Sequence, residues 1–139
     1  MKIPYYRLII ACCLMCSLPL QAEVVIIVHA SNHAEINPAY LKRIFLGKVV
    51  YFPGGKTATP LNAESGTELR TAFEQRILRK SDAQVRSYWA KRIFTGKGIP
   101  PKEISLTKMV QMVASDPRFI GYTTTKHNLG DSVRVVSQH

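Results

Sequence analysis

The sequence predicts a three-layer α/β domain in which a mixed sheet is flanked by helices. Runs rich in β-branched residues alternate along the chain with segments whose apolar residues recur every three to four positions. Most of the helix-like segments also carry residues that are typical of helix starts and ends. This alternation of strands and helices favours helices packed on both faces of one sheet.

The first 22 residues have the composition of a secretory leader. Lys2 and Arg7 precede an apolar block from Leu8 to Leu20, and the small residue Ala22 stands at the expected cleavage position. The block is too short for a stable membrane span. We expect residues 1–22 to be a signal peptide and the mature protein to be periplasmic, with no membrane span after cleavage.

The remaining residues, 23–139, are enough for one modest domain with a single core. The three cysteines of the sequence, Cys12, Cys13 and Cys16, lie inside the leader, so the mature domain would have neither disulfides nor a thiolate site. An alternative stays open, because Ile9 to Cys12 loosely resembles a lipoprotein signal and would place a lipid on Cys12.

The composition is strongly basic. Nineteen Lys and Arg stand against nine Asp and Glu, which gives a net charge of +10, and loss of Lys2 and Arg7 with the leader lowers it to +8. Such a balance attracts anions. Nucleic acid is not expected as a partner, because the chain is exported and its basic residues are spread over helices without interleaved aromatics. A solvated basic face is the alternative explanation.

The first elements after the leader are a strand and a short helix. Val24 to Val28 is a continuous β-branched run, typical of a central strand that is buried on both faces. Ser31 and Asn32 fall in the loop that follows. Asn37 followed by proline predicts a helix start, and Gly47 predicts the end of that helix.

A second strand leads into the segment on which the functional prediction depends. Thr57 to Asn62 is predicted to be a short strand. Ser65 followed three positions later by Glu68 is a capping-box pattern, which predicts a helix that starts at Ser65 and runs to Leu78. The residues predicted to turn away from the apolar face of this helix are Arg70, Thr71 and Glu74.

The second half of the chain repeats the same kinds of signal. Ser81 and Gln84 form another capping box, and the residues expected to point inward from its helix are Val85, Tyr88, Trp89 and Ile93. The pattern KRIFxGK, which occurs at Lys42 and again at Lys91, places cations and a glycine at two helix ends. The prediction ends with a rigid connector at Gly98–Pro101 and a helix over Leu106–Val113 that stops before Asp116. Two strands follow, at Phe119–Thr123 and Val133–Val136.

The loop between the second strand and its helix is a candidate oxyanion site. A strand, a tight loop and a helix N-terminus together direct backbone donors toward a ligand beyond the end of the strand. Gly66 would let an oxyanion approach, Ser65 and Thr67 would add hydroxyls, and Arg70 would lie one turn away. The alternative interpretation is that this segment merely caps a helix.

Four segments follow one another in a distinctive order: Ile44–Lys48, Tyr51–Gly55, Ser65–Thr67 and Asp116–Tyr122. They resemble the periplasmic substrate-binding proteins of phosphate transporters. The resemblance spans roughly Pro38 to Thr123 and corresponds to one lobe of the two-lobed type 2 periplasmic-binding fold. It implies that residues 23–139 form a single phosphate-binding-protein-like lobe whose Ser-Gly-Thr element donates hydrogen bonds to bound phosphate.

The chain departs from the family at two positions. Where the family usually carries an Arg and an Asp shortly before the serine, this chain has Leu61 and Ala63. The Asp of the family reads the proton of hydrogen phosphate, so its loss weakens selectivity for phosphate over sulfate. The opposing lobe is absent from this chain. Ser31, Asn32 and Thr123 are expected to contribute to oxyanion binding from loops that face the Ser65 loop.

Two functional hypotheses follow. The first is an exported substrate-binding-protein-like module that binds phosphate or a similar oxyanion. The second is a single-lobe accessory or protein-interaction module of an envelope complex, such as a transporter, with a decayed ligand site. No enzyme activity or cofactor is expected, because no serine has a glycine elbow or an activating histidine. The spacing of His29 and His33 across a strand end does not favour a metal site either.

Overall fold

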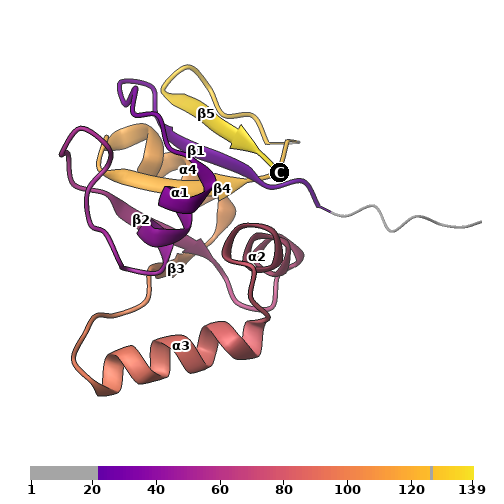
Figure 1. The fold of residues 1–139 in the computed structure, drawn as a ribbon. Helices are drawn as coiled ribbons and strands as arrows, with labels where there is room; N and C mark the ends of the chain where they lie inside the picture. The colour runs from indigo at the N-terminus through magenta and orange to yellow at the C-terminus, as the bar shows by residue number, and fades with distance from the viewer. Residues whose placement is uncertain (1–21, 126) are drawn as a thin grey trace, which may run out of the picture.

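The computed structural model describes residues 22–125 and 127–139, so the expected leader lies outside the described residues except for Ala22. Five strands form one mixed sheet in the order β3-β2-β4-β1-β5 (Figure 1). β1 runs antiparallel to β4 and β5, whereas β2 runs parallel to β3 and β4. The strands are β1 (Val25–His29), β2 (Thr59–Ala63), β3 (Lys102–Ile104), β4 (Phe119–Thr123) and β5 (Val133–Gln138).

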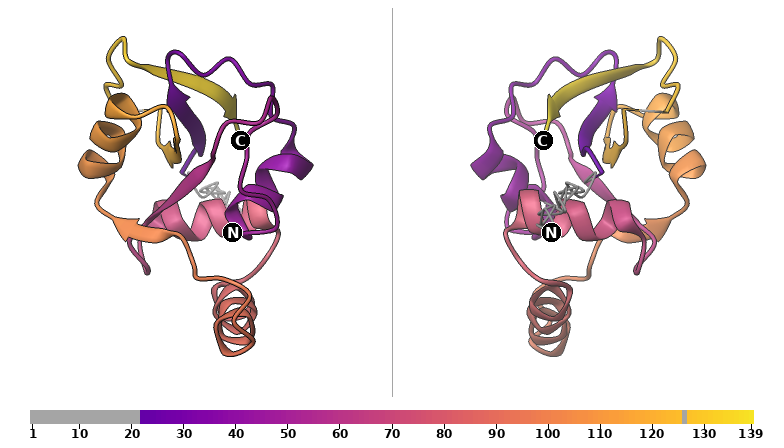
Figure 2. Two further views of the ribbon diagram at one scale, coloured as in Figure 1. Left: turned by 90° about the vertical axis from the view of Figure 1, so that its left-hand side faces the viewer. Right: turned by 90° about the vertical axis from the view of Figure 1, so that its right-hand side faces the viewer.

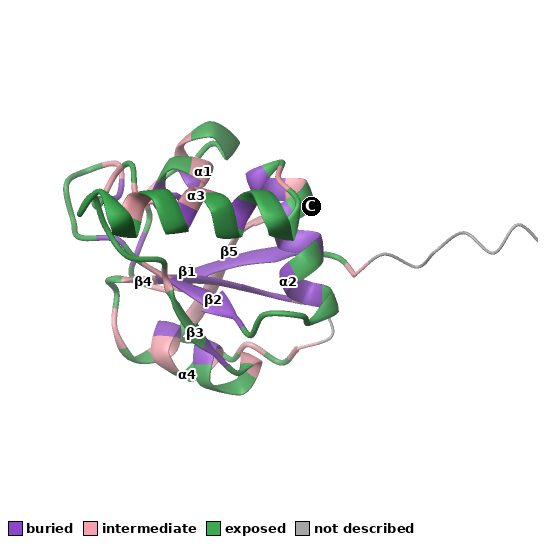
Figure 3. Cartoon of the chain, turned by 90° about the horizontal axis from the view of Figure 1, so that it is seen from below, coloured by how far each residue is buried: buried purple, intermediate pink, exposed green. Residues whose placement is uncertain are grey.

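Helices cover both faces of the sheet, which confirms the predicted α/β fold class. α4 lies on one side of the sheet and α1 on the other (Figure 2). The view from below shows α3 on the same side as α1, with most of its outer surface exposed (Figure 3). The helices are α1 (Pro38–Phe45), α2 (Glu68–Phe73), the π-helical segment η1 (Glu74–Leu78), α3 (Asp82–Phe94) and α4 (Leu106–Ser115). Within the described residues no helix is long and apolar enough to cross a membrane.

Local signals in the sequence explain where several elements begin. The side chain of Asn37 accepts a 2.8 Å hydrogen bond from the backbone N–H of Tyr40 and caps α1 as predicted. Ser81 and Gln84 form the predicted capping box of α3. β1 lies between β4 and β5 and is buried along most of its length, so its β-branched run is the central strand that was expected.

The core is centred on an aromatic cluster between the sheet and the α1–η1 side. The ring of Phe73 stacks on that of Tyr122 with centroids 3.8 Å apart, and Phe45 meets Phe73 edge-on at 4.7 Å. On the other face, α4 packs directly on β4 at Gly121. A Cβ at this position would lie 2.7 Å from the Sδ and Cγ atoms of Met109, so any larger residue would force the Met109 side chain to shift.

The predicted start of the helix after β2 is wrong. The structure caps α2 with Thr67, whose Oγ1 accepts from the backbone N–H of Arg70, and Ser65 lies before the helix. The predicted outward direction of Arg70 and Glu74 is also wrong, because both residues are buried. They pair with one another inside the protein, which offsets part of the penalty for burying each charge.

Two further predictions fail in the region of α3. Ile93 is 54% exposed instead of pointing inward, because the last turn of α3 extends beyond the packed body of the protein. Only Val85 and Trp89 of the expected inward residues are buried. β3 was not predicted at all, because a three-residue strand that follows two prolines carries no recognisable pattern.

Candidate functional site

The loop from Glu64 to Thr67 leaves the end of β2 at a point that buried hydrogen bonds fix in place. The backbone N–H of Ala63 donates to the hydroxyl of Tyr122 over 2.9 Å, and that hydroxyl donates to Oδ1 of Asn62 over 3.0 Å. Tyr122 is fully buried on β4, and burial raises the pKa of its phenol above the ordinary value, so the group stays neutral. The last residues of β2 are therefore held at both the backbone and the side chain.

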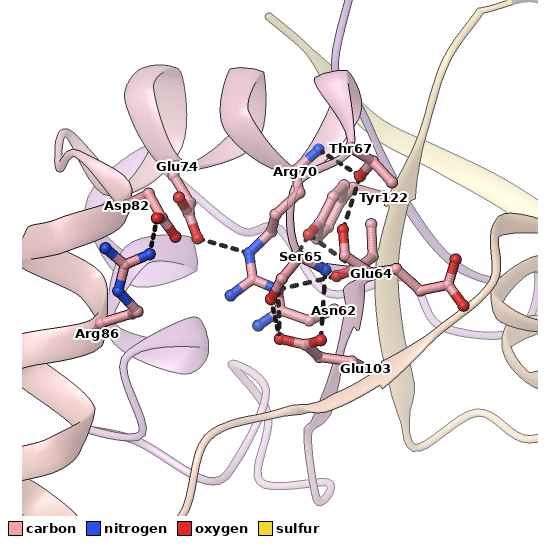
Figure 4. A network of polar contacts seen from close by, with 11 residues as sticks. Asn62, Glu64, Ser65, Thr67, Arg70, Glu74, Asp82, Arg86, Glu103 and Tyr122 are labelled. Atoms are coloured by element: carbon pink, nitrogen blue, oxygen red, sulfur yellow. Dashed lines mark hydrogen bonds and ion pairs between the residues drawn. The ribbon is translucent and has the colours of Figure 1, made fainter.

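The parallel pairing of β2 with β3 brings Glu103 to this loop (Figure 4). The hydroxyl of Ser65 donates a 2.6 Å hydrogen bond to Oε1 of Glu103, and the backbone N–H of Ser65 lies 3.3 Å from Oε2. The hydrogen bond from the Ser65 hydroxyl is the main cause that lowers the pKa of Glu103. A carboxylate thus occupies the position next to Ser65 that was predicted for an external oxyanion.

Arg70 contributes a third donor to the same carboxylate. Its Nη1 atom lies 3.1 Å from Oε1 of Glu103 and donates to the backbone oxygen of Ala63 over 2.8 Å. Its Nε atom donates to Glu74 over 2.6 Å. Burial raises the pKa of Glu74, although the ion pair with Arg70 opposes this shift. Arg70 is therefore a buried, fixed guanidinium that faces Glu103 on one side and Glu74 on the other.

Gly66 and Thr67 have distinct roles in the loop. Gly66 has a φ angle of +81°, a conformation that favours glycine, and a Cβ at this position would meet no atom within 4 Å. The glycine is thus explained by the backbone turn. The hydroxyl of Thr67 donates to the backbone oxygen of Glu64 over 2.8 Å while it caps α2, so its one hydrogen-bond donor is already used within the loop.

The structure brings one of the three additional candidates to this end of the sheet and separates the other two. Thr123 ends β4, which runs parallel to β2, so it lies at the same end as Ser65; its hydroxyl is buried without a hydrogen-bond partner. Ser31 and Asn32 follow the other end of β1, because Val25 pairs with Thr123 in the antiparallel β1–β4 ladder. The expectation that their loop faces the Ser65 loop is therefore wrong.

Ser31 and Asn32 have local partners instead. The hydroxyl of Ser31 lies 2.8 Å from Nδ1 of His29, and Oδ1 of Asn32 accepts from the backbone N–H of Ala34 over 3.0 Å. Nδ2 of Asn32 is buried without a partner. These contacts are those of a tight turn after β1. Within residues 22–125 and 127–139, no group of three His, Cys, Asp or Glu side chains is placed to hold a metal ion.

Glu103 and Tyr122 are the participants that the sequence did not point to as site residues. Glu103 lies 38 positions from Ser65, and Tyr122 lies 59 positions from Ala63. Each reaches the loop only through the pairing of strands that are distant in the sequence. No local spacing could have indicated either residue, although Tyr122 belongs to a strand that the sequence does predict.

Comparison by sequence finds no family model that matches the chain and no match among characterised proteins. Comparison of folds does find similar structures. A structure from Clostridium perfringens, described as a phosphate ABC transporter substrate-binding protein with bound phosphate, has a TM-score of 0.63 at 18% identity and matches 83% of this chain with 45% of its own. The fold of this chain is therefore like that of a substrate-binding protein.

Two further structures show the same relationship. An ABC-type phosphate transport receptor from Vibrio cholerae matches 84% of this chain with 46% of its own, at 13% identity and a TM-score of 0.62. PstS from Borrelia burgdorferi matches 84% of this chain with 47% of its own, at 12% identity and a TM-score of 0.60. The chain thus spans slightly less than half the length of these structures, and at such identities the likeness concerns the fold alone.

Proposed function

We propose that this chain is an exported, periplasmic binding module that takes a small oxyanion of the phosphate class at the Ser65 loop. The single observation that carries the proposal is the convergence of three donors on one oxyanion. The backbone N–H and hydroxyl of Ser65 and Nη1 of Arg70 all point at the carboxylate of Glu103. Donors arranged for a carboxylate can also serve phosphate, since both present negatively charged oxygens.

In this proposal Glu103 is an internal occupant that an external oxyanion must displace. Its side chain is 45% exposed, so it can swing into solvent, whereas Arg70 is held by Ala63 and Glu74 and stays in place. Displacement of Glu103 frees the hydroxyl and backbone N–H of Ser65 for the ligand, and Gly66 and Thr67 complete the loop around it. Because the charge of Glu103 competes with the ligand, we expect weak binding by the unmodified chain.

The fold likeness supports a binding role over a catalytic one, because the similar structures carry names of transport receptors and substrate-binding proteins. The bound phosphate named for the Clostridium perfringens structure belongs to a protein of about twice this length. In this chain Leu61 and Ala63 stand where the resemblance to those proteins implies an Arg and an Asp. We therefore propose an oxyanion site without strong selectivity between phosphate and sulfate.

The test is titration calorimetry of residues 23–139, which contain every described helix and strand, with phosphate and with sulfate. We expect saturable heat that survives at physiological salt, and loss of that heat in Ser65→Ala. Ser87→Ala is the matched control, because Ser87 is an exposed serine on α3. Equal heats in the two variants, or no heat from either anion, would contradict the proposal.

A second candidate is an accessory or interaction module of an envelope complex in which the ligand site has decayed. The observation in its favour is that Glu103 already satisfies the donors that a ligand would need. This candidate predicts that the loop binds no phosphate even after Glu103 is replaced. The variant Glu103→Ala therefore separates the two candidates.

A further inference from the structure

Two segments of this chain carry no acidic residue, and the fold places them side by side. Residues 36–63 and residues 83–102 contain neither Asp nor Glu, although they hold nine of the basic residues. Arg92 joins them, because its Nη2 atom donates to the backbone oxygens of Gly47 over 3.1 Å and of Lys97 over 2.7 Å. The two stretches without acidic residues therefore adjoin at Arg92.

An apolar groove of about 490 Å³ lies between the two segments. It is lined from one side by residues around Val50 and β2 and from the other by Trp89 and the connector that includes Ile99. At one extremity of the molecule, α3 and this connector project away from the sheet (Figure 1). The groove thus lies between this projecting part and the body of the protein that includes β2.

Exposed apolar side chains gather on the same two segments. Phe94 is 92% exposed and Ile99 is 81% exposed. Among the described residues, these two segments contain five of the six large exposed hydrophobic side chains: Val50, Tyr51, Ile93, Phe94 and Ile99. Single exposed apolar residues need no explanation, but five of them on two adjoining segments that lack acidic residues are typical of a docking surface.

We propose that this surface docks on an anionic phospholipid bilayer, with Phe94 and Ile99 entering the acyl layer while lysines contact the headgroups. We name it the basic apolar surface and define it by Lys48, Val50, Lys91, Phe94, Lys97 and Ile99. Aromatic and aliphatic side chains beside Lys and Arg are the composition with which peripheral proteins bind membrane interfaces. The surface lacks any acidic residue that anionic lipids would repel.

Charge and shape favour a bilayer over other occupants. A second copy of this chain would bring two strongly basic surfaces together, which is unfavourable. A peptide lying in the groove would leave Phe94 uncovered, because Phe94 is not among the residues that line it. A bilayer does not need the groove, because it requires only exposed apolar side chains such as Phe94 and Ile99. The inference does not rest on the proposed oxyanion site, so Ser65→Ala should leave lipid binding unchanged.

The test is sedimentation of residues 23–139 with vesicles of phosphatidylcholine alone and of phosphatidylcholine mixed with phosphatidylglycerol. We expect binding to the mixed vesicles only. Lys91→Gln and Lys97→Gln should each weaken it about fivefold, and Phe94→Ser with Ile99→Ser about tenfold. The matched controls are Lys108→Gln on α4 and Val135→Ser on β5, which lie outside the surface and should bind like the unmodified chain.

Three outcomes would overturn the inference. The first is equal binding to both kinds of vesicle, and the second is unchanged binding of the Phe94→Ser and Ile99→Ser variant. The third is binding of a synthetic acidic peptide with apolar anchors when mixed vesicles do not bind, which would indicate a protein partner instead. Because the substituted residues are exposed, each variant is expected to keep its fold, and circular dichroism checks this.

Discussion

The hydroxyl of Ser65 lies 2.6 Å from Oε1 of Glu103, and the two residues are 38 positions apart in the sequence. The contact exists because β2 and β3 run parallel and in register, with Asn62 opposite Glu103. It gives the loop its own carboxylate in the place where an external oxyanion is proposed to bind. Whether the chain binds phosphate then depends on how readily this internal carboxylate leaves.

Replacing Glu103 by Ala should increase the affinity for phosphate. The change frees the hydroxyl and N–H of Ser65 and one donor of Arg70, and it removes a competing charge. Hydrogen bonds to charged groups contribute enough for a gain of about tenfold or more in affinity. Titration calorimetry measures this. Glu64→Ala is the control, because it removes an exposed charge from the same loop without freeing the Ser65 donors, and an equal gain there would contradict the prediction.

The stability that Glu103 contributes should disappear in acid. The pKa of Glu103 is lowered in the folded state from its ordinary value of 4.5, mainly by the Ser65 hydroxyl. The unfolded chain therefore binds a proton more readily, so the contribution is present above pH 4.5 and is lost as the pH falls through the lowered value. Urea unfolding of the unmodified chain and of Glu103→Gln, from about pH 7 to about pH 3, should show a difference that narrows in acid.

Glu74 must be separated from this effect, because its pKa is shifted in the opposite direction. Burial raises the pKa of Glu74, so its contribution to stability increases as the pH falls. Both chains in the comparison keep Glu74, and the difference between them therefore reports on Glu103. A difference that stays constant over the whole pH range would mean that Glu103 acts only through uncharged contacts.

The elements that the sequence predicted well are those whose signals lie close together along the chain. Asn37 caps α1 three residues before its hydrogen-bond donor, and Ser81 and Gln84 cap α3 within the same distance. The buried run in β1 predicted its own central position, because a strand that is apolar on both faces needs cover on both faces. For these elements, the local sequence pattern and the contacts in the folded protein agree.

The site was predicted less well than the fold, because contacts with residues that are distant in the sequence override what the local pattern predicts. Ser65 and Glu68 satisfy the capping-box pattern, yet the hydroxyl of Ser65 bonds to Glu103, and Thr67 caps the helix instead. Arg70 shows the same effect, since a position that local periodicity assigns to the surface becomes buried once Glu74 and Glu103 surround it. Such outcomes depend on strand register, which the sequence alone does not provide.

Replacing Arg70 by Met should destabilise the protein strongly. The variant leaves Glu74, which is 1% exposed, as a buried charge without its partner. Breaking a buried ion pair in this way typically costs about 3–5 kcal/mol, measured as the free energy of unfolding in urea. The double variant Arg70→Met with Glu74→Leu should regain most of the loss, because it removes both charges. An equally unstable double variant would show that the contacts of Arg70 with Ala63 and Glu103 matter more than its pair with Glu74.

Replacing Tyr122 by Phe should weaken both the fold and the site. The lost hydroxyl leaves the backbone N–H of Ala63 and Oδ1 of Asn62 without their buried partner, which costs about 1–3 kcal/mol in the free energy of unfolding. The Ser65 loop starts directly after Ala63, so phosphate binding should fall in the same variant. Tyr40→Phe is the matched control, because it removes a hydroxyl that bonds to Tyr51 in an exposed position. Since water can replace that partner, the control should lose little stability and should keep its phosphate affinity. An equal loss of phosphate affinity in the two variants would contradict a positioning role for Tyr122.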